Sequence, residues 1–291
     1  MAARVYRLHV GARTAGLLDL LTLEPIEENI FRGSSLDETR RRVFGGQVAA
    51  QALVAAGSTV QSRRVHSLHA YFLRPGDPHR PILYEVDRIR DGRSFSTRWV
   101  IGVQHGKTIF GLMCSFHRDE EGLVHGDRMP EVPDPETLPG LAEALKDGDA
   151  SAPLFANTYG VDIRFVTEYP WKRGGAPADR EQLWLRAAVP IGDDPLVHAA
   201  VLTFASDLTL VDTILQRHGT TPYDDRFIGA SLDHSIWFHR PFRADEWLFY
   251  DQTSPIAFGA RGLARGLLYS RSGDLVASAV QEGLVRLPTE A

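Results

Sequence analysis

The sequence repeats itself: Val65-His66-Ser67-Leu68-His69-Ala70-Tyr71-Phe72-Leu73-Arg74-Pro75 returns as Ser231-Leu232-Asp233-His234-Ser235-Ile236-Trp237-Phe238-His239-Arg240-Pro241. The two copies are 166 positions apart, and each has an aromatic pair, one further residue and then Arg-Pro. A second match, 167 positions apart, aligns the segment from Ser94 to Cys114 with the segment from Arg261 to Gln281. Matches in the same order and at nearly the same spacing indicate a duplicated structural unit.

Each copy combines one helix with several strands. We predict a helix over Gly45 to Ala56, because its residues are small or apolar on almost every side, as in a helix enclosed by other structure. The apolar residues between Asp207 and Gln216 follow a helical period, and we predict the equivalent buried helix there, with Ser206 as its N-cap. Strands are predicted where aromatic and β-branched residues gather, at 68–73, 81–90, 95–104, 108–117, 235–240, 246–252, 260–270 and 275–287.

A long helix followed by an antiparallel meander is typical of a sheet wrapped around a helix. Glycines follow both predicted helices, and the pairs Asp91-Gly92, His105-Gly106 and Ser272-Gly273 predict hairpin turns between strands. Two such units in tandem predict an α+β double hotdog. We place an N-terminal unit at 1–119, a proline-rich acidic linker at 120–157 with a short helix over Leu141 to Lys146, and a C-terminal unit at 158–291.

Composition excludes several classes of partner. The formal charge is −5, and no run of basic residues exceeds Arg40 to Arg42, which argues against a nucleic-acid surface.

No apolar stretch is long enough for membrane insertion, and no targeting segment precedes the first unit, so we predict a cytoplasmic protein. Cys114 is the one cysteine and is interpreted as a core residue. Unpaired sheet edges favour a homo-oligomer, either a dimer or a tetramer.

Several motifs resemble a known family, the acyl-CoA thioesterase II group, which includes bacterial TesB-type enzymes and peroxisomal relatives. The resemblance implies an acyl-CoA thioester hydrolase that releases fatty acid and CoA without a cofactor. It also implies a catalytic Asp, Ser or Thr, and Gln, which fall on Asp207, Ser231 and Gln281. Ser231 stands where some relatives have threonine. The motifs are Phe31-Arg32-Gly33, Val43-Phe44-Gly45-Gly46-Gln47, His66 to Asp77, Arg90 to Phe95, Ala205 to Leu208, Asp233 to Phe242 and Val280 to Gly283.

Local sequence supports these three roles unequally. Asp207 can act as a base, and burial would raise its pKa while the N-terminus of its predicted helix would lower it; it can also simply favour that helix dipole. Gln281 interrupts an apolar run, so a buried amide that needs partners is one interpretation and an exposed strand residue is another. Ser231 has no local pattern of its own, and its role depends on the other two residues.

The duplication predicts that only one site per chain is active. The first-copy counterparts of Ser231 and Gln281 are Val65 and Cys114, which cannot perform the same chemistry. The counterpart of Asp207 is expected near Gln47.

Other interpretations use the same residues. His66, His69, His234 and His239 invite a metal site, but they lack ligand spacing, and we predict no metal. Asp233-His234 offers the pair of a hotdog enoyl-CoA hydratase, yet neighbouring residues of a strand point to opposite faces. A non-catalytic acyl-CoA-binding module remains the third alternative, and the intact Asp207, Ser231 and Gln281 set argues against it.

Overall fold

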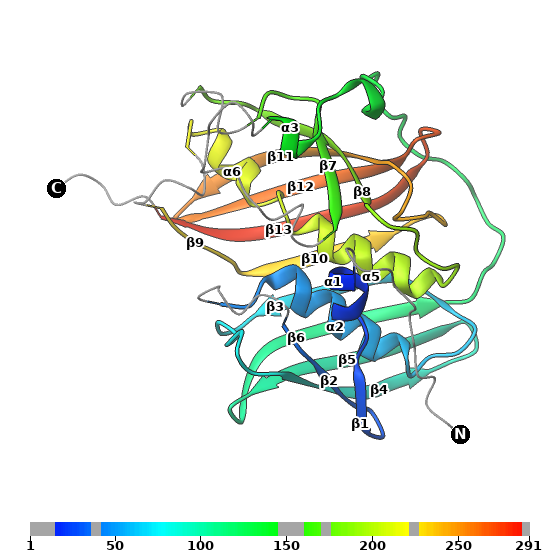
Figure 1. Cartoon of the computed structure of the whole chain (residues 1–291). Helices are drawn as coiled ribbons and strands as arrows, with labels where there is room; N and C mark the ends of the chain where they lie inside the picture. Colours follow the sequence, from blue (N-terminus) through cyan, green and yellow to red (C-terminus); the bar gives the residue numbers. More distant parts are fainter. Residues whose placement is uncertain (1–14, 36–41, 145–159, 170–175, 221–226, 287–291) are drawn as a thin grey trace.

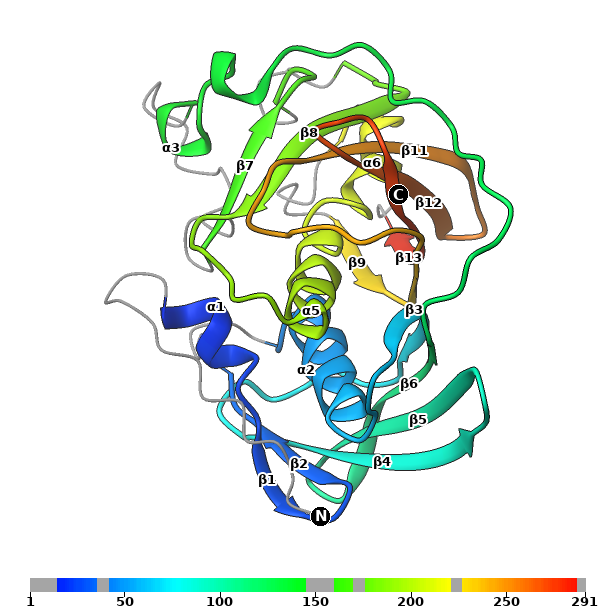
Figure 2. The ribbon, with the colours of Figure 1, turned by 90° about the vertical axis from the view of Figure 1, so that its right-hand side faces the viewer.

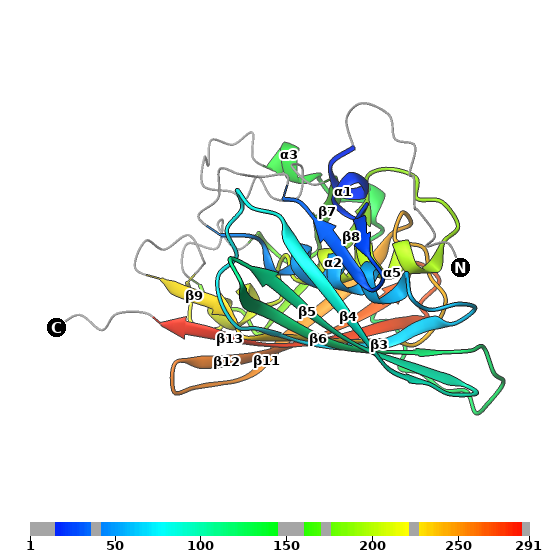
Figure 3. The ribbon, with the colours of Figure 1, turned by 90° about the horizontal axis from the view of Figure 1, so that it is seen from below.

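One curved sheet encloses two helices in the computed structural model, which describes residues 15–35, 42–144, 160–169, 176–220 and 227–286. The strands of these residues form a single 13-stranded sheet, and every strand pairing in it is antiparallel (Figure 1). The two long helices lie together on one side of the sheet (Figure 3). The predicted α+β arrangement, with two units that each wrap a sheet around a helix, is confirmed.

The elements follow one another in nearly the same order in both units. In the first unit they are α1 (Ala15–Leu20), β1 (Glu24–Glu27), β2 (Ile30–Gly33), α2 (Gly45–Gly57), β3 (Arg64–Phe72), β4 (Ile82–Asp91), β5 (Phe95–Gln104) and β6 (Lys107–His117). A connection follows, with the 3₁₀ helix η1 (Pro135–Thr137) and α3 (Leu141–Ala144). The second unit contains β7 (Val161–Phe165), β8 (Arg180–Ala187), α5 (Pro195–Ser206), α6 (Asp212–Gln216), β9 (Ile228–Ser231), β10 (Asp233–Phe238), β11 (Leu248–Phe258), β12 (Arg261–Ser270) and β13 (Leu275–Arg286).

The repeated motif forms the junction between the units. Its two copies are β3 and β10, which pair antiparallel with His69 opposite Ser235 and Leu68 opposite Ile236. The sheet order is β1-β2-β4-β5-β6-β3-β10-β13-β12-β11-β8-β7, with β9 paired to β13 beside this path. The two units therefore share one continuous hydrogen-bonded sheet.

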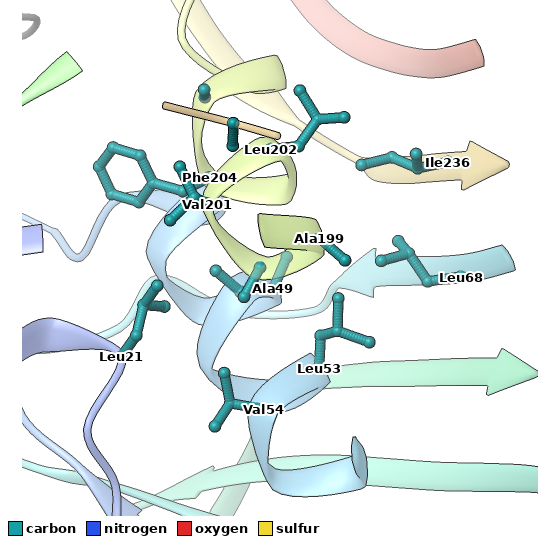
Figure 4. Close-up of a cluster of buried hydrophobic side chains, with 14 of the residues drawn as sticks. Leu21, Ala49, Leu53, Val54, Leu68, Ala199, Val201, Leu202, Phe204 and Ile236 are labelled. Atoms are coloured by element: carbon teal, nitrogen blue, oxygen red, sulfur yellow. The ribbon is translucent and has the colours of Figure 1, made fainter. Parts of the chain in front are cut away.

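The two central helices pack against each other beneath this junction (Figure 2). Figure 4 shows Leu53 and Ala199 facing Leu68 and Ile236, so both helices and both junction strands contribute to one core. The alanines of α2 are fully buried, and small residues allow two helices to lie close together. None of the helices in the described part of the chain has the length and apolar character of a membrane span.

The second central helix differs from its prediction. It is α5, Pro195–Ser206, and not the segment from Asp207 to Gln216. Asp194 caps α5 by accepting a hydrogen bond from the Leu196 N–H at 2.9 Å, and Pro195 occupies the first turn, where its missing N–H costs nothing. Ser206 therefore ends this helix instead of capping the next one. Of the predicted segment, only the short α6 is helical.

Strands and turns agree better with the sequence. All eight predicted strands are present as β3 to β6 and β10 to β13, and β1, β2, β7, β8 and β9 were not predicted. His105 and Gly106 both have positive φ, 49° and 67°, as a two-residue hairpin turn requires. The helix predicted over Leu141 to Lys146 is present as α3, and its last two residues lie outside the described ones.

Candidate active site

The carboxylate of Asp207 joins the two central helices. Asp207 is the C-cap residue of α5, yet its side chain accepts a hydrogen bond from the backbone N–H of Gly46, in the first turn of α2. The N-cap residue of α2 is Phe44, which provides no side-chain hydrogen bond. A residue of the second unit therefore caps the helix of the first unit, where the positive end of the helix dipole favours an anion.

The helix dipole beside Asp207 is not that of the helix predicted to begin at this residue. Asp207 follows the last turn of α5 and begins no helix of its own. The helix N-terminus beside its carboxylate belongs to α2.

Two glycines make room for the carboxylate. A Cβ atom at Gly45 would lie 2.9 Å from Oδ2 of Asp207 and 2.9 Å from the ring of Phe72. A Cβ atom at Gly46 would lie 2.7 Å from the carbonyl oxygen of Phe204. Larger residues at these positions would push α5 and its Asp207 away from the start of α2.

Gln281 and Ser231 approach the same carboxylate from two paired strands. The Gln281 amide donates from Nε2 to Oδ1 of Asp207 at 2.5 Å, and Gln281 is fully buried on β13. Ser231 is the last residue of β9, pairs with Gly283 of β13, and hydrogen-bonds through its hydroxyl to Asp207. The three residues that the resemblance selected thus lie together, and their roles in catalysis stay a prediction.

Burial controls the charge of Asp207. Removal of the carboxylate from water raises its pKa to about 6, while hydrogen bonds from Gln281, Gly46 and Ser231 act in the opposite direction. The group is therefore mostly ionised at neutral pH, and it accepts a proton far more readily than an exposed aspartate.

A second carboxylate, Asp212 in the first turn of α6, belongs to the same environment. Burial, and to a smaller extent the negative charge of Asp207, raise its pKa to about 7. Two carboxylates that repel each other resist simultaneous ionisation. Asp212 is not among the predicted site residues, since nothing in its local sequence distinguishes it from any acidic residue in a first helical turn.

His234 lies behind Gln281, on β10. Its side chain is fully buried, and Nε2 lies 2.9 Å from Oγ of Ser206. Burial lowers its pKa to about 4, so the imidazole is neutral at physiological pH, and the nearby Gln281 amide acts in the opposite direction. Among the described residues, Nδ1 of His234 and Oε1 of Gln281 have no partner at full hydrogen-bond geometry. A small adjustment would therefore let each satisfy the other.

The remaining candidates lie elsewhere. Asp233 is turned away from His234, and its carboxylate accepts the Glu282 N–H at 2.7 Å. Cys114 is a core residue of β6, as predicted, and burial raises the pKa of its thiol. Within the described ranges, no three His, Cys, Asp or Glu side chains are grouped as a metal site would require.

A carboxylate, a hydroxyl and an amide at the start of a helix can together bind and activate a water molecule. The carboxylate can take a proton from it, and the hydroxyl and the amide can orient it. The start of α2 is suited to negative charge, which is the charge that develops when a carbonyl is attacked.

Comparisons with known proteins agree with this chemistry. Two family models match, "Acyl-CoA thioesterase" at residues 154–284 and "Acyl-CoA thioesterase N-terminal domain" at residues 34–117. The chain is 42% identical to acyl-coenzyme A thioesterase 8 of Mus musculus, covering 94% of this chain and 90% of that one. It is 39% identical to acyl-CoA thioesterase 2 of Haemophilus influenzae, with coverages of 93% and 96%.

Solved structures give the same result. The acyl-CoA thioesterase II TesB2 of Mycobacterium marinum is 42% identical, with a TM-score of 0.78 and coverages of 94% and 98%. A protein of Alicyclobacillus acidocaldarius described as having a hot dog fold superposes with a TM-score of 0.78 at 21% identity, which supports the fold alone.

Proposed function

Since this chain belongs to the acyl-CoA thioesterase family, we propose that it hydrolyses fatty acyl-CoA to fatty acid and CoA by using Asp207, Ser231 and Gln281. The observation that carries this assignment is the convergence of a serine hydroxyl, a glutamine amide and the α2 N-terminus on one buried carboxylate. Buried ionisable groups with a strongly shifted pKa and several specific partners cluster at functional sites.

The reaction needs one base and one nucleophile. Asp207 removes a proton from a water molecule that the Gln281 amide and the Ser231 hydroxyl orient, and the water oxygen attacks the thioester carbonyl carbon. When the carbon–sulfur bond breaks, the CoA sulfur receives the proton from Asp207, and the carboxyl group of the fatty acid is left behind. The positive end of α2 lies beside the developing negative charge and stabilises it.

The alternatives are less favoured. A hydratase would need Asp233 and His234 to act together, but their side chains lie on opposite faces of β10. A binding module would not need a carboxylate that is costly to bury and has a pKa near neutrality.

Thiol release from acyl-CoAs of increasing chain length tests the proposal. We expect saturable turnover by the wild type and at least about a hundredfold loss of kcat/KM in Asp207→Asn, because amide nitrogen cannot accept the proton. Asp87→Asn, a surface carboxylate on β4, is the matched control and should leave kcat/KM unchanged. Equal rates in Asp207→Asn and wild type would remove Asp207 as the base. Binding without turnover of any acyl-CoA would instead favour the binding module.

We also propose that the enzyme is a homo-oligomer. The outer face of the sheet carries large exposed side chains next to the junction between units, and exposed patches of this kind mark contact surfaces. They are Tyr71 of β3, Trp99 of β5, Met113 of β6 and Trp237 of β10. Light scattering after size exclusion would measure the mass, and Trp99→Lys should lower it. A monomeric wild type would contradict the proposal.

The cytoplasm is the proposed location. Cys114 is the one cysteine of the chain, so the fold has no intrachain disulfide that an oxidising compartment would have to form. Fractionation of the source cells, with detection of the native protein, tests this location.

A further inference from the structure

A cavity of about 310 Å³ lies at the opposite end of the junction strands from Asp207. The start of β3, at Arg64 and Val65, and the end of β10, at Phe238, form two of its sides, and the N-terminus of α5 forms another. The active-site carboxylate lies instead near Phe72, at the end of β3. The volume is within the range of small-molecule sites, about 300 to 1,000 Å³.

The duplication explains where this cavity comes from. Val65 in its wall is the repeat counterpart of Ser231, and Cys114 is the counterpart of Gln281. Ser58 caps α2 at its C-terminus as Asp207 caps α5, so it is the structural counterpart of Asp207, and the expected position near Gln47 is wrong. Of these three counterparts Val65 lines the cavity, so the cavity lies beside the place that a second active site would have.

The catalytic set of the first site is not reproduced around this cavity. The hydroxyl of Ser58 donates to the Val54 carbonyl of its own helix at 2.8 Å, and a serine there provides no base. Asp194 already caps the α5 N-terminus, so that end of the helix does not resemble the start of α2 in the active site.

The wall chemistry suits an anion with an apolar tail. The apolar part consists of Val65, Ala199, Phe238 and Phe242, and three arginines lie around it, Arg64, Arg118 and Arg240. Two carboxylates of the same wall partly offset their charge: Asp119 lies 3.6 Å from Nε of Arg64, and Glu120 lies 2.5 Å from Nε of Arg118.

Donor groups remain available to a ligand. Arg240 contacts Asp274 through Nη1 at 2.5 Å, and the Arg64 and Arg118 ion pairs use Nε, so none of these contacts uses every guanidinium N–H.

We propose that this cavity binds a fatty carboxylate without hydrolysing it, with the carboxylate at the arginines and the chain on the apolar wall. The duplicated fold thus has one catalytic site and one binding site for an anionic amphiphile. Such binding does not depend on the roles assigned to Asp207, Ser231 and Gln281.

Calorimetry with decanoate tests the proposal in full-length protein whose catalytic groove is saturated with the non-hydrolysable thioether S-decyl-CoA. The wild type should still bind decanoate, and Arg64→Ala with Arg118→Ala should weaken this binding at least about tenfold, because charge-assisted hydrogen bonds are lost. Both arginines are surface residues, so the variant should fold. Arg88→Ala, on β4 and outside the cavity, is the matched control.

A variant whose side chain fills the cavity gives a second test of decanoate binding. Val65→Phe should abolish decanoate binding, and its thermal melting curve shows whether the fold persists. Unchanged decanoate affinity in the arginine variant would overturn the proposal. So would CoA binding at the arginines without any decanoate binding, since this would assign the site to phosphates and leave the apolar wall without a role.

Discussion

The most informative residue of the site is Asp207, because its charge changes within the physiological pH range. A base must be ionised to accept a proton, so kcat/KM should fall as pH drops below about 6, the pKa to which burial raises this group. Steady-state rates from pH 4.5 to 8.5 measure this fall in kcat/KM at low pH, which is the acid limb of the pH–rate profile. A profile that stays flat through pH 6 would contradict the role of Asp207 as the base.

Asp212 titrates above Asp207. Burial and the charge of Asp207 raise the pKa of Asp212 to about 7, so this carboxyl is largely protonated near pH 6, where Asp207 loses its charge. Asp212→Asn keeps the side chain neutral and should therefore leave the acid limb and the maximal rate nearly unchanged. The same pH series measures this, and Asp87→Asn serves again as the control. A shift of the acid limb to lower pH would show that Asp212 is ionised while Asp207 titrates.

Burial of Asp207 also predicts a cost in stability. Its folded-state pKa, about 6, exceeds the ordinary 3.8, so the folded protein binds the proton more tightly and loses stability as pH rises from about 4 through 6. The loss approaches about 3 kcal/mol for a shift of this size. Asp207→Asn should therefore become more stable relative to wild type between pH 5 and 8. Denaturant unfolding at pH 5 and at pH 8 measures the free energy of unfolding of both proteins. The same difference between variant and wild type at the two pH values would contradict the prediction.

His234 is expected to position Gln281 and not to react. His234→Ala should lower kcat about tenfold to a hundredfold with little change in KM, because a loosened amide misplaces the water. The acid limb near pH 6 should remain, since Asp207 is retained. His125→Ala, an exposed histidine, is the control. Loss of that limb would mean that His234 itself titrates in the mechanism.

At the scale of elements, the start of α2 contacts the active-site carboxylate, whereas its end serves packing alone. Gly45→Ala brings a methyl group to 2.9 Å from Oδ2 of Asp207 and should reduce kcat about tenfold or more, since it displaces the base. Gly57→Ala meets the side chain of Leu196 at 2.4 Å, so it should lower the melting temperature and leave kcat nearly intact. Equal effects on kcat would show that the contact with Asp207 is not what requires glycine at position 45.

The two central helices also show where a pattern misleads. The apolar residues after Asp207 follow a helical period, yet the long helix lies before them, at Pro195–Ser206, and begins at the Asp194 cap and Pro195. A cap followed by proline is a stronger start than a serine within an apolar stretch. A helical period alone does not show where a helix begins.

At the scale of the whole molecule, neither unit has a complete core. β3 pairs with β10 across the junction, and α2 packs on α5, so residues 1–119 alone would expose one sheet edge and one apolar helix face. We expect this fragment to lack cooperative unfolding, and co-expression with residues 120–291 to restore it. Calorimetry and circular dichroism measure both. A cooperative transition in the isolated fragment would support independent domains at the proposed boundaries.

The sequence by itself determined the duplication, eight of the strands, helix α2, the hairpin turn at His105-Gly106 and the family. These features depend on residues close together along the chain: on the side-chain period of two residues in strands and 3.6 in helices, and on turn residues. Local sequence patterns therefore predict them. It also selected Asp207, Ser231 and Gln281 as candidate site residues, through the resemblance and not through their local surroundings.

Only the tertiary structure decided how the candidate site is built. A carboxylate from the end of α5 caps α2 of the other unit, β9 brings Ser231 beside β13, and Asp212 and His234 join from α6 and β10. These contacts join segments far apart in the chain, and their effects arise from burial and from charges that meet only after folding. A pKa near 6 at Asp207 is a property of that enclosure, because the same residue in an open chain would titrate near 3.8.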